Sequence, residues 1–558
     1  MNYIVGRSQA AIFAALGTIV VLWQMLLPGY VLTLDMVFGP AHVLPGLTVT
    51  GISNGLPLQL VLYGAGFLVP MWAVEKILLI SLFFALFYLP LRFPPFNLTW
   101  YPARYVAAAL YAVNPFVYER FLAGHWAVLC GYALLAPFLF FLLKLAHTPT
   151  RRVALSMAVV VLLASVFSLH VFTMCMLILV VVIGALALWN LFTRNRAKAL
   201  HIAEQGILAL ATIVIVSCYW LVPLALHPQS SPVESFGQAN WEAYTTAADP
   251  LLGAGGNVVL LYGIWSEGYY QMHQFLSPKD FPTATLPSLL VLSVLVVTGI
   301  ASALRKREYR CAAITLIAIA AAAFVFSVGI ADGPLHSFNL WLFEHVSFWR
   351  GFRDTQKWSM LIALSYSLFA ALGVSAIAST VRPRLRWGVL VLAILSVLLY
   401  TSPMLGGFDG QLRSVQYPEE WYEINAQLSQ DPQCRAVFLP WHQYYTLSFN
   451  GDILTGNTAP AFFNCDIVSG RAAELANVPD AGATDPVYEA IAQAVTDNSP
   501  RDNAASIAAL RKEGIHYVIV TSDLGNADIF KYPFLADPSL STLSESTVGN
   551  ETVVLLKL

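Results

Sequence analysis

The chain has 558 residues, of which 58% are hydrophobic and 11% are charged, and its mean hydropathy is +0.66. Soluble domains carry about 25% charged residues, so a wholly soluble protein is excluded. The net charge of −2 does not indicate a partner, because the charge is segregated along the chain rather than spread over one surface. We expect no nucleic-acid partner.

Long apolar segments dominate the first 402 residues. A membrane-spanning helix needs about 20 mostly apolar residues. About eleven spans are predicted, near 9–27, 70–90, 104–118, 127–143, 153–169, 171–192, 203–226, 284–304, 311–330, 356–380 and 387–402. The turn between 153–169 and 171–192 is very short. The segments together predict an α-helical polytopic membrane domain over residues 1–402.

Lys and Arg occur in clusters, and two apolar segments separate each cluster from the next. The clusters are Arg7; Arg92 with Arg104; Lys144, Arg151 and Arg152; Arg194, Arg196 and Lys198; Arg305, Lys306, Arg307 and Arg310; and Arg382, Arg384 and Arg386. Cytoplasmic loops are enriched in Lys and Arg. We therefore predict a multi-pass protein of the plasma (inner) membrane with a cytoplasmic N-terminus, and with loops 28–69, 227–283 and 331–355 on the outer face.

Residues 403–558 differ from the rest, because Asp, Asn, Pro and Gly surround short apolar runs. An odd number of spans places this region outside the cytoplasm. Strands are predicted at 435–439, 516–521 and 552–556, and helices after Asp485 and from 503 to 513. We predict a C-terminal extracytoplasmic α/β domain.

This outer region holds two of the chain's six cysteines, Cys434 and Cys465. An even pair in an oxidising compartment predicts a disulfide, with two unrelated thiols as the alternative. The other four cysteines lie in apolar spans, where buried thiols are common.

The first two outer loops contain titratable residues close to the membrane. Asp35 is a lone carboxylate between apolar neighbours, so it should have either a partner or a function. The next outer loop brings Glu119, Arg120 and His125 within seven residues, and His170 lies in the following outer turn. The alternative for this cluster is an interfacial Glu119–Arg120 surface pair.

Two later outer loops are rich in aromatic or basic residues. Trp265 and Tyr269 belong to an aromatic set that either forms an interfacial belt or stacks on sugar faces. Arg350, Arg353 and Lys357 are cations on the outer face, against the positive-inside pattern. An anionic phosphate or an acidic partner would explain them.

The layout resembles that of the GT-C glycosyltransferase superfamily. The shared features are about eleven spans, an acid in the first outer loop, a polar cluster after the third span and an outer α/β domain. Residues 114–126 and 348–358 resemble segments of bacterial membrane proteins of that superfamily, including the YfhO-like group and the membrane half of mycobacterial arabinosyltransferases.

The resemblance implies transfer of a sugar from a polyprenyl-phosphate donor to a hydroxyl of a glycan, lipid or protein acceptor, in envelope glycan or glycoprotein assembly. Asp35 then matches the general base. Glu119 and His125 are further catalytic candidates.

The remaining candidate residues would bind the substrate. Arg350, Arg353 and Lys357 would offset charge on the leaving phosphate, and Arg120, His170, Trp265 and Tyr269 would bind substrate. Asp35 lacks the paired acids of an Asp-x-Asp pattern, so the sequence gives no support for a metal ion or other cofactor.

Two other function classes remain open. A transporter or flippase of a lipid-linked precursor could use the same outer groove, although no span carries a central Asp, Lys or Arg suited to ion coupling. A non-catalytic envelope assembly protein is also compatible with the outer domain. Removing the Asp35 carboxylate discriminates between these classes, because only an enzyme should lose its function.

Topology is the first testable prediction. Reporters fused after Arg310 and after Arg386 should be cytoplasmic, and a reporter fused after Leu558 should be external, because the basic clusters remain inside. Paired alkaline phosphatase and fluorescent-protein fusions measure this. A cytoplasmic reporter at Leu558 would contradict an outward-facing site.

Overall fold

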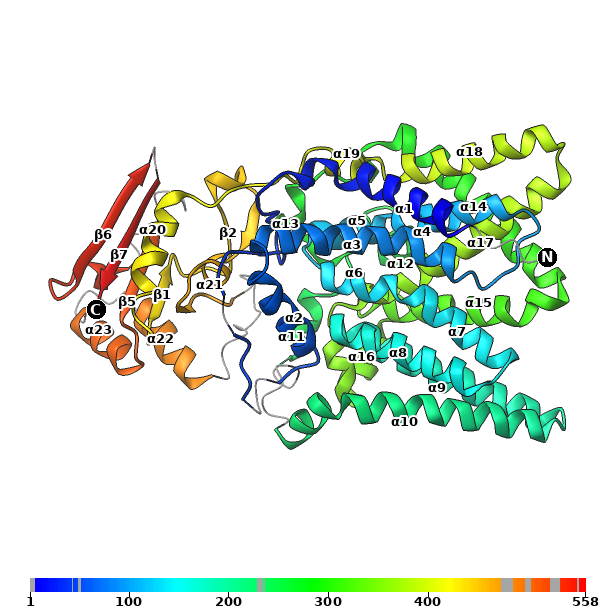
Figure 1. The fold of residues 1–558 in the computed structure, drawn as a ribbon, viewed down its shortest axis with the longest axis horizontal. Helices are drawn as coiled ribbons and strands as arrows, with labels where there is room; N and C mark the ends of the chain where they lie inside the picture. Colours follow the sequence, from blue (N-terminus) through cyan, green and yellow to red (C-terminus); the bar gives the residue numbers. More distant parts are fainter. Residues whose placement is uncertain are drawn as a thin grey trace.

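A computed structural model of the chain shows a helical bundle joined to a smaller domain that contains a sheet. The two regions follow each other along the long axis, and the two chain ends lie at opposite ends of that axis (Figure 1). The structure describes residues 6–42, 44–48, 52–227, 233, 236–472, 485–496, 503–521, 532–548 and 551–558.

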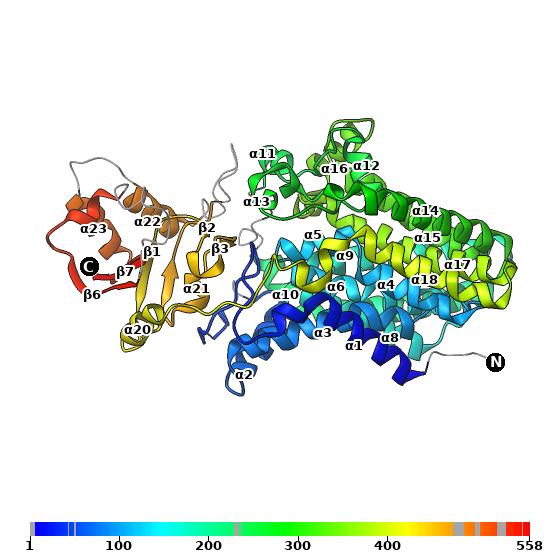
Figure 2. The ribbon, with the colours of Figure 1, turned by 90° about the horizontal axis from the view of Figure 1, so that it is seen from above.

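The bundle consists of long apolar helices that run roughly side by side (Figures 1 and 2). They are α1 (Arg7–Leu22), α3 (Met71–Arg92), α6 (Trp126–Ala133) followed by α7 (Leu135–His147), α8 (Arg151–Phe167), α9 (Leu169–Phe192), α10 (Arg196–Leu226), α14 (Pro282–Arg305), α15 (Arg307–Val328), α17 (Ser359–Thr380) and α18 (Pro383–Tyr400). Shorter helices are α2 (Leu56–Gly66), α4 (Arg104–Ala112), α5 (Pro115–Leu122), α11 (Gln238–Ala243), α12 (Gly253–Val259), α13 (Tyr270–His273) and α16 (His336–His345).

Within the described residues, nine helices are long and apolar enough to cross a membrane. The other two predicted spans are shorter. Helix α8 has 17 residues, and the segment 104–118 is divided into α4 and α5. The division has a local cause: the Asn114 side chain accepts a hydrogen bond from Val117 N at 3.1 Å, and Pro115 at the first turn cannot continue the preceding helix.

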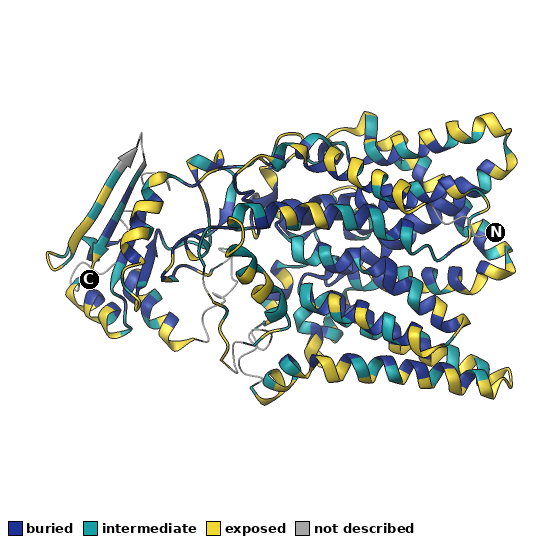
Figure 3. Cartoon of the chain, viewed as in Figure 1, coloured by how far each residue is buried: buried dark blue, intermediate teal, exposed yellow. Residues whose placement is uncertain are grey.

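Helix α17 lies at the centre of the bundle, and α10 lies at its edge. In their most apolar stretches, 83% of the residues are buried in the span of α17 and 22% in α10. Gly299 of α14 and Gly373 of α17 allow these two helices to touch, since a Cβ at either position would lie 1.9 Å from a backbone oxygen of the other helix. The outer faces of the bundle are apolar yet exposed (Figure 3), as expected for contact with lipid. The chain is a multi-pass membrane protein.

The C-terminal domain is α/β, as the sequence predicted. Its five-stranded sheet has the order β4-β1-β5-β7-β6, in which β4 (Asp466–Val468), β1 (Arg435–Leu439) and β5 (Tyr517–Thr521) are parallel, and β7 (Glu551–Lys557) and β6 (Ser541–Val548) are antiparallel. Its helices are α20 (Glu419–Leu428), α21 (Ala459–Phe462), α22 (Pro486–Thr496) and α23 (Asn503–Lys512), and α19 (Leu405–Phe408) precedes it. Cys434 and Cys465 form a disulfide.

A second, two-stranded sheet of this domain, β2 (Tyr444–Thr446) with β3 (Leu454–Gly456), faces the bundle (Figure 2). The hairpin pairs with the first outer loop through a parallel bridge between Leu34 and Thr455. Asp35 therefore lies at the junction of the two regions.

Candidate active site

The backbone around Asp35 is held from two sides. On the outer side, Leu34 N donates to Leu454 O at 3.2 Å, and Gly456 N donates to Leu34 O at 2.7 Å. On the membrane side, Asp35 N donates to Ala123 O at 3.2 Å, just after the end of α5. The hairpin and the end of α5 together fix the height of this carboxylate above the bundle.

Gly124 allows the first outer loop to pass directly against the end of α5. Its φ is +80°, which favours glycine, and a Cβ here would lie 2.1 Å from Met36 N and 2.6 Å from Asp35 C. Any side chain at position 124 would therefore push Asp35 away from its neighbour His125.

The Asp35 carboxylate accepts a hydrogen bond on each oxygen. Oδ2 lies 3.0 Å from His125 Nε2, and Oδ1 accepts the Tyr444 hydroxyl at 2.5 Å. Burial would raise the pKa of Asp35, but the hydrogen bonds from His125 and Tyr444 and the charge of Lys357 lower it below its usual value. The side chain is 44% exposed. Asp35 is thus an ionised, oriented carboxylate that remains accessible.

Arg120 determines which nitrogen of His125 carries the proton. Arg120 Nη1 lies 3.1 Å from His125 Nδ1, and a guanidinium can only donate. Nδ1 is therefore the acceptor, and Nε2 carries the hydrogen that is donated to Asp35. Burial, partly offset by Asp35, lowers the pKa of His125. The imidazole is neutral at neutral pH.

Arg120 itself is completely buried and forms a two-pronged pair with Asp354. Nη2 donates to Asp354 Oδ1 at 2.8 Å, Nη1 donates to Oδ2, and Nε donates to Gln356 Oε1 at 3.1 Å. Burial would raise the pKa of Asp354, but the charges of Arg120 and Lys357 hold it well below its usual range. The pair connects α5 to the segment that precedes α17.

Lys357 and His170 extend this polar group. Lys357 Nζ lies 3.5 Å from Asp354 Oδ2 and 3.5 Å from His170 Nε2. The His170 ring nitrogen donates to Gly351 O at 2.9 Å. Both predicted residues therefore lie within the cluster that begins at Arg120.

The two predicted arginines have different surroundings. The Arg353 guanidinium lies 4.0 Å from the ring centres of both Phe236 and Tyr244 and donates to Asn240 at 2.9 Å. Arg350 lies over the Trp241 ring at 5.9 Å and donates to Phe343 O at 3.4 Å. Of the two arginines, Arg353 is connected to the Asp35 region through Tyr244. The Tyr244 ring also packs on Trp265, with ring centres 4.6 Å apart.

Trp265 links Asp35 to a larger cavity, in whose wall Glu119 lies. A small recess at Asp35 is lined by Trp265, together with Leu34, Ala123, His125, Ser266, Gln271 and Tyr444. The larger cavity, of about 820 Å³, is lined by Trp265, Tyr269 and Glu119 among others.

Glu119 accepts from Ile264 N at 3.2 Å and shares a hydrogen bond with Glu267. Burial and this second carboxylate raise the pKa of Glu119 well above its usual value.

Several residues of the site carried no sequence prediction. Asp354 and Gln356 fall inside the segment 348–358, where the density of charge was a usable signal. Tyr444 had no such signal, because it lies 409 residues from Asp35 in the chain. Among the described residues, no group of three or more His, Cys, Asp or Glu side chains is arranged to hold a metal ion.

The close passage at Gly124 gives a test of this geometry. Gly124→Ala should lower the apparent unfolding midpoint, because a left-handed backbone costs about 1–2 kcal/mol for a residue with a Cβ and the new methyl group meets Met36 N. Gly46→Ala is the matched control, since a Cβ there has no atom within 4 Å. Thermal unfolding in detergent measures both, and equal midpoints for the two variants would contradict the close passage.

No protein-family model matches the sequence, and no curated protein matches it. Among solved structures, the chain is similar to arabinofuranosyltransferase AftD from Mycobacteria, with a TM-score of 0.63 and 16% identity over 100% of this chain and 40% of that one. For a mutant form of AftD, the TM-score is 0.61 and the identity is 15%, over 100% of this chain and 42% of that one. For the archaeal oligosaccharyltransferase AglB from Archaeoglobus fulgidus, the TM-score is 0.47 and the identity is 12%, over 92% of this chain and 69% of that one.

The chain spans about 40% of the length of AftD. At this identity the likeness concerns the fold alone. The predicted architecture is confirmed: the chain has a fold like that of AftD, a polytopic helical bundle with a C-terminal α/β domain.

Proposed function

We propose that the chain is a glycosyltransferase that moves a sugar from a polyprenyl-phosphate donor to an acceptor hydroxyl on the outer membrane face, in envelope glycan or glycoprotein assembly. One observation carries the proposal: the exposed Asp35 carboxylate is held on both oxygens at the junction of the bundle and the outer domain. The fold shared with AftD, named as an arabinofuranosyltransferase, supports the same reaction class. In this proposal the N-terminus is cytoplasmic and residues 403–558 lie outside.

Asp35 is suited to act as the general base. In the proposed reaction the acceptor oxygen attacks the anomeric carbon, and the bond from that carbon to the phosphate oxygen breaks. The hydroxyl proton moves to Asp35, and polyprenyl phosphate leaves with the bonding electrons. His125 and Tyr444 hold the carboxylate in one orientation and favour its ionised form, so it is ready to take the proton.

The charges around Asp35 favour an anionic donor on one side. Arg120, Arg353 and Lys357 are three cations near two carboxylates, Asp35 and Asp354, and the Arg120–Asp354 pair neutralises itself. Lys357 also pairs with Asp354, so with Asp35 ionised the group keeps one net positive charge, at Arg353 and Lys357, to offset the charge of a phosphate. We assign Arg350 to the support of this wall, because its guanidinium packs on Trp241 and reaches Phe343 O.

An apolar groove of about 440 Å³ lies in the membrane region between α9 and α15. Val181 and Trp189 line one wall, Ile319 lines the other, and Trp358 contributes from the start of α17. Trp358 follows directly after Lys357 in the chain. A prenyl chain packed in this groove by dispersion contacts would bring its phosphate to the level of Lys357.

Asp35→Asn tests the proposal most directly. The amide keeps the shape but cannot take the proton, so transfer should fall about 100-fold or more while donor binding and the unfolding midpoint remain close to wild type. Purified protein is incubated with a panel of polyprenyl-phosphate sugars, and hydrolysis and transfer are measured. Asp466→Asn changes an exposed carboxylate in β4 that pairs with Arg435, and because surface ion pairs contribute little to stability, this variant should keep wild-type turnover. Retained turnover in Asp35→Asn would refute the assignment of the base, and an assembly protein or flippase would show no wild-type turnover.

The dependence of the rate on pH provides a separate test. Because the pKa of Asp35 is lowered, the base remains ionised down to about pH 3.9, the ordinary value for Asp, or below. Tyr444→Phe removes a hydrogen bond that favours the ionised form, so the acid limb of kcat/KM should move to higher pH by about one unit. Tyr445→Phe is the control, since its hydroxyl contacts Asn457 and Thr458 instead. An unmoved limb in Tyr444→Phe would contradict this role.

A further inference from the structure

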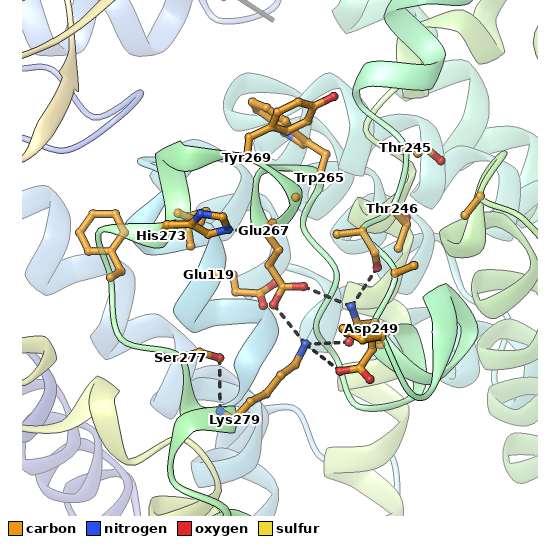
Figure 4. Close-up of a pocket in the computed structure, with 18 of the residues that line it drawn as sticks. Glu119, Thr245, Thr246, Asp249, Trp265, Glu267, Tyr269, His273, Ser277 and Lys279 are labelled. Atoms are coloured by element: carbon orange, nitrogen blue, oxygen red, sulfur yellow. Dashed lines mark hydrogen bonds and ion pairs between the residues drawn. The ribbon is translucent and has the colours of Figure 1, made fainter. Parts of the chain in front are cut away.

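The larger cavity beside the Asp35 recess has the properties of a saccharide site. It measures about 820 Å³ and is built mainly by residues 242–280, with Tyr118, Glu119, Ala331 and Asp332 from neighbouring segments. Figure 4 shows Trp265, Glu267, Asp249 and Lys279 arranged around it.

The cavity wall is acidic. Five carboxyl groups line it besides Glu119, namely Glu242, Asp249, Glu267, Asp280 and Asp332, and Lys279 is the single Lys or Arg among its described lining residues. Lys279 Nζ is occupied by Glu267 at 3.4 Å, Asp249 at 3.6 Å and Asn257 at 2.8 Å (Figure 4). An anionic phosphate would therefore meet like charge here, and the donor belongs on the side of Lys357 and Arg353 instead.

The same wall offers the groups that bind neutral sugars. Trp265 and Tyr269, with ring centres 5.8 Å apart, provide aromatic surface for the C–H faces of a sugar ring. The carboxylates accept hydrogen bonds from hydroxyl groups, and the raised pKa of Glu119 adds a protonated acid. The buried Thr245 hydroxyl has no hydrogen-bond partner among the described residues.

Unsatisfied polar groups continue from this cavity to Asp35. Gln271 and Ser266 line the recess at Asp35 and are each 1% exposed. Within the described chain, neither the Gln271 amide nor the Ser266 hydroxyl has a hydrogen-bond partner. A buried amide without a partner costs free energy, and hydroxyl groups of a bound ligand would satisfy both. Trp265 lines both spaces, which places the recess at Asp35 next to the cavity.

We infer that this cavity binds the acceptor as a neutral saccharide, with the reacting hydroxyl at Asp35 beside Gln271 and Ser266. The inference rests on the proposed function and adds the class of acceptor and its route of approach. Donor and acceptor then enter from opposite sides of Asp35, the donor along the cationic, lipid-facing side and the acceptor through the acidic outer cavity.

Cysteine protection tests the site whichever neutral sugar it binds. Gly268 lines the cavity and a Cβ there has no atom within 4 Å, so Gly268→Cys fits. The full-length variant, with the exposed Cys218 and Cys311 replaced by Ser, is modified in nanodiscs with a membrane-impermeant maleimide. Neutral oligosaccharides of pentofuranose and hexopyranose are added, and farnesyl phosphate is added separately. At a concentration about tenfold above its dissociation constant, a bound saccharide should slow the modification about tenfold.

Gly46→Cys, in the first outer loop, should be modified at the same rate with and without saccharide. In the Gly268→Cys background, Gln271→Met removes the unpartnered amide while it keeps the volume, so the unfolding midpoint should not fall, but the dissociation constant should rise about tenfold and the protection should drop from about tenfold to about twofold. Failure of every saccharide to protect, or equal protection by farnesyl phosphate, would overturn the acceptor site.

Donor hydrolysis measured on the same preparation separates the two ideas. Hydrolysis without saccharide protection would overturn the acceptor site and leave the transferase intact. Protection without any donor turnover would overturn the transferase and leave a saccharide-binding cavity.

Discussion

The buried pair between Arg120 and Asp354 is the interaction on which the site depends. A guanidinium out of contact with water is stable only when its charge and its N–H groups are matched, and Asp354 with Gln356 supplies that match. The pair joins α5 to the segment that precedes α17, the most buried of the nine candidate membrane spans among the described residues. One N–H of Arg120 remains for His125, and that contact sets the imidazole tautomer and the direction in which it donates. The Arg120–Asp354 pair therefore helps to orient Asp35 through His125, although it does not contact Asp35.

The second constraint is the junction between the bundle and the outer domain. Asp35 receives one hydrogen bond from each region, His125 from the end of α5 and Tyr444 from the hairpin β2–β3. Neither region alone completes the carboxylate environment. Because Gly124 has no side chain, the loop that carries Asp35 can pass close enough for Asp35 to contact both His125 and Tyr444. The C-terminal domain therefore supplies part of the candidate site, although it lies far along the chain from Asp35.

Charge and polarity are sorted around this centre. Lys357, which pairs with Asp354, and Arg353 are the cations of this centre, and Trp358, the residue after Lys357, lines the apolar groove between α9 and α15. The larger cavity is acidic and aromatic, and among the described residues its Thr245 hydroxyl and the Gln271 amide of the neighbouring recess have no hydrogen-bond partner. In the proposed function this difference in charge would favour a phosphate near Lys357 and a neutral polyol in the acidic cavity.

The sequence by itself determined the membrane class and the position of a C-terminal α/β domain in the chain, and it singled out Asp35 as a candidate, because apolar length, composition and an isolated carboxylate are local properties of the chain. It also placed His125 and Lys357 among the candidates. Only the tertiary structure decided that 104–118 is broken at Asn114, that Glu119 faces the second cavity, and that Tyr444 completes the site. Contacts between residues hundreds of positions apart depend on how helices pack and how domains dock, and no local pattern encodes them. The sequence determined which groups are present, and packing decided which of them meet.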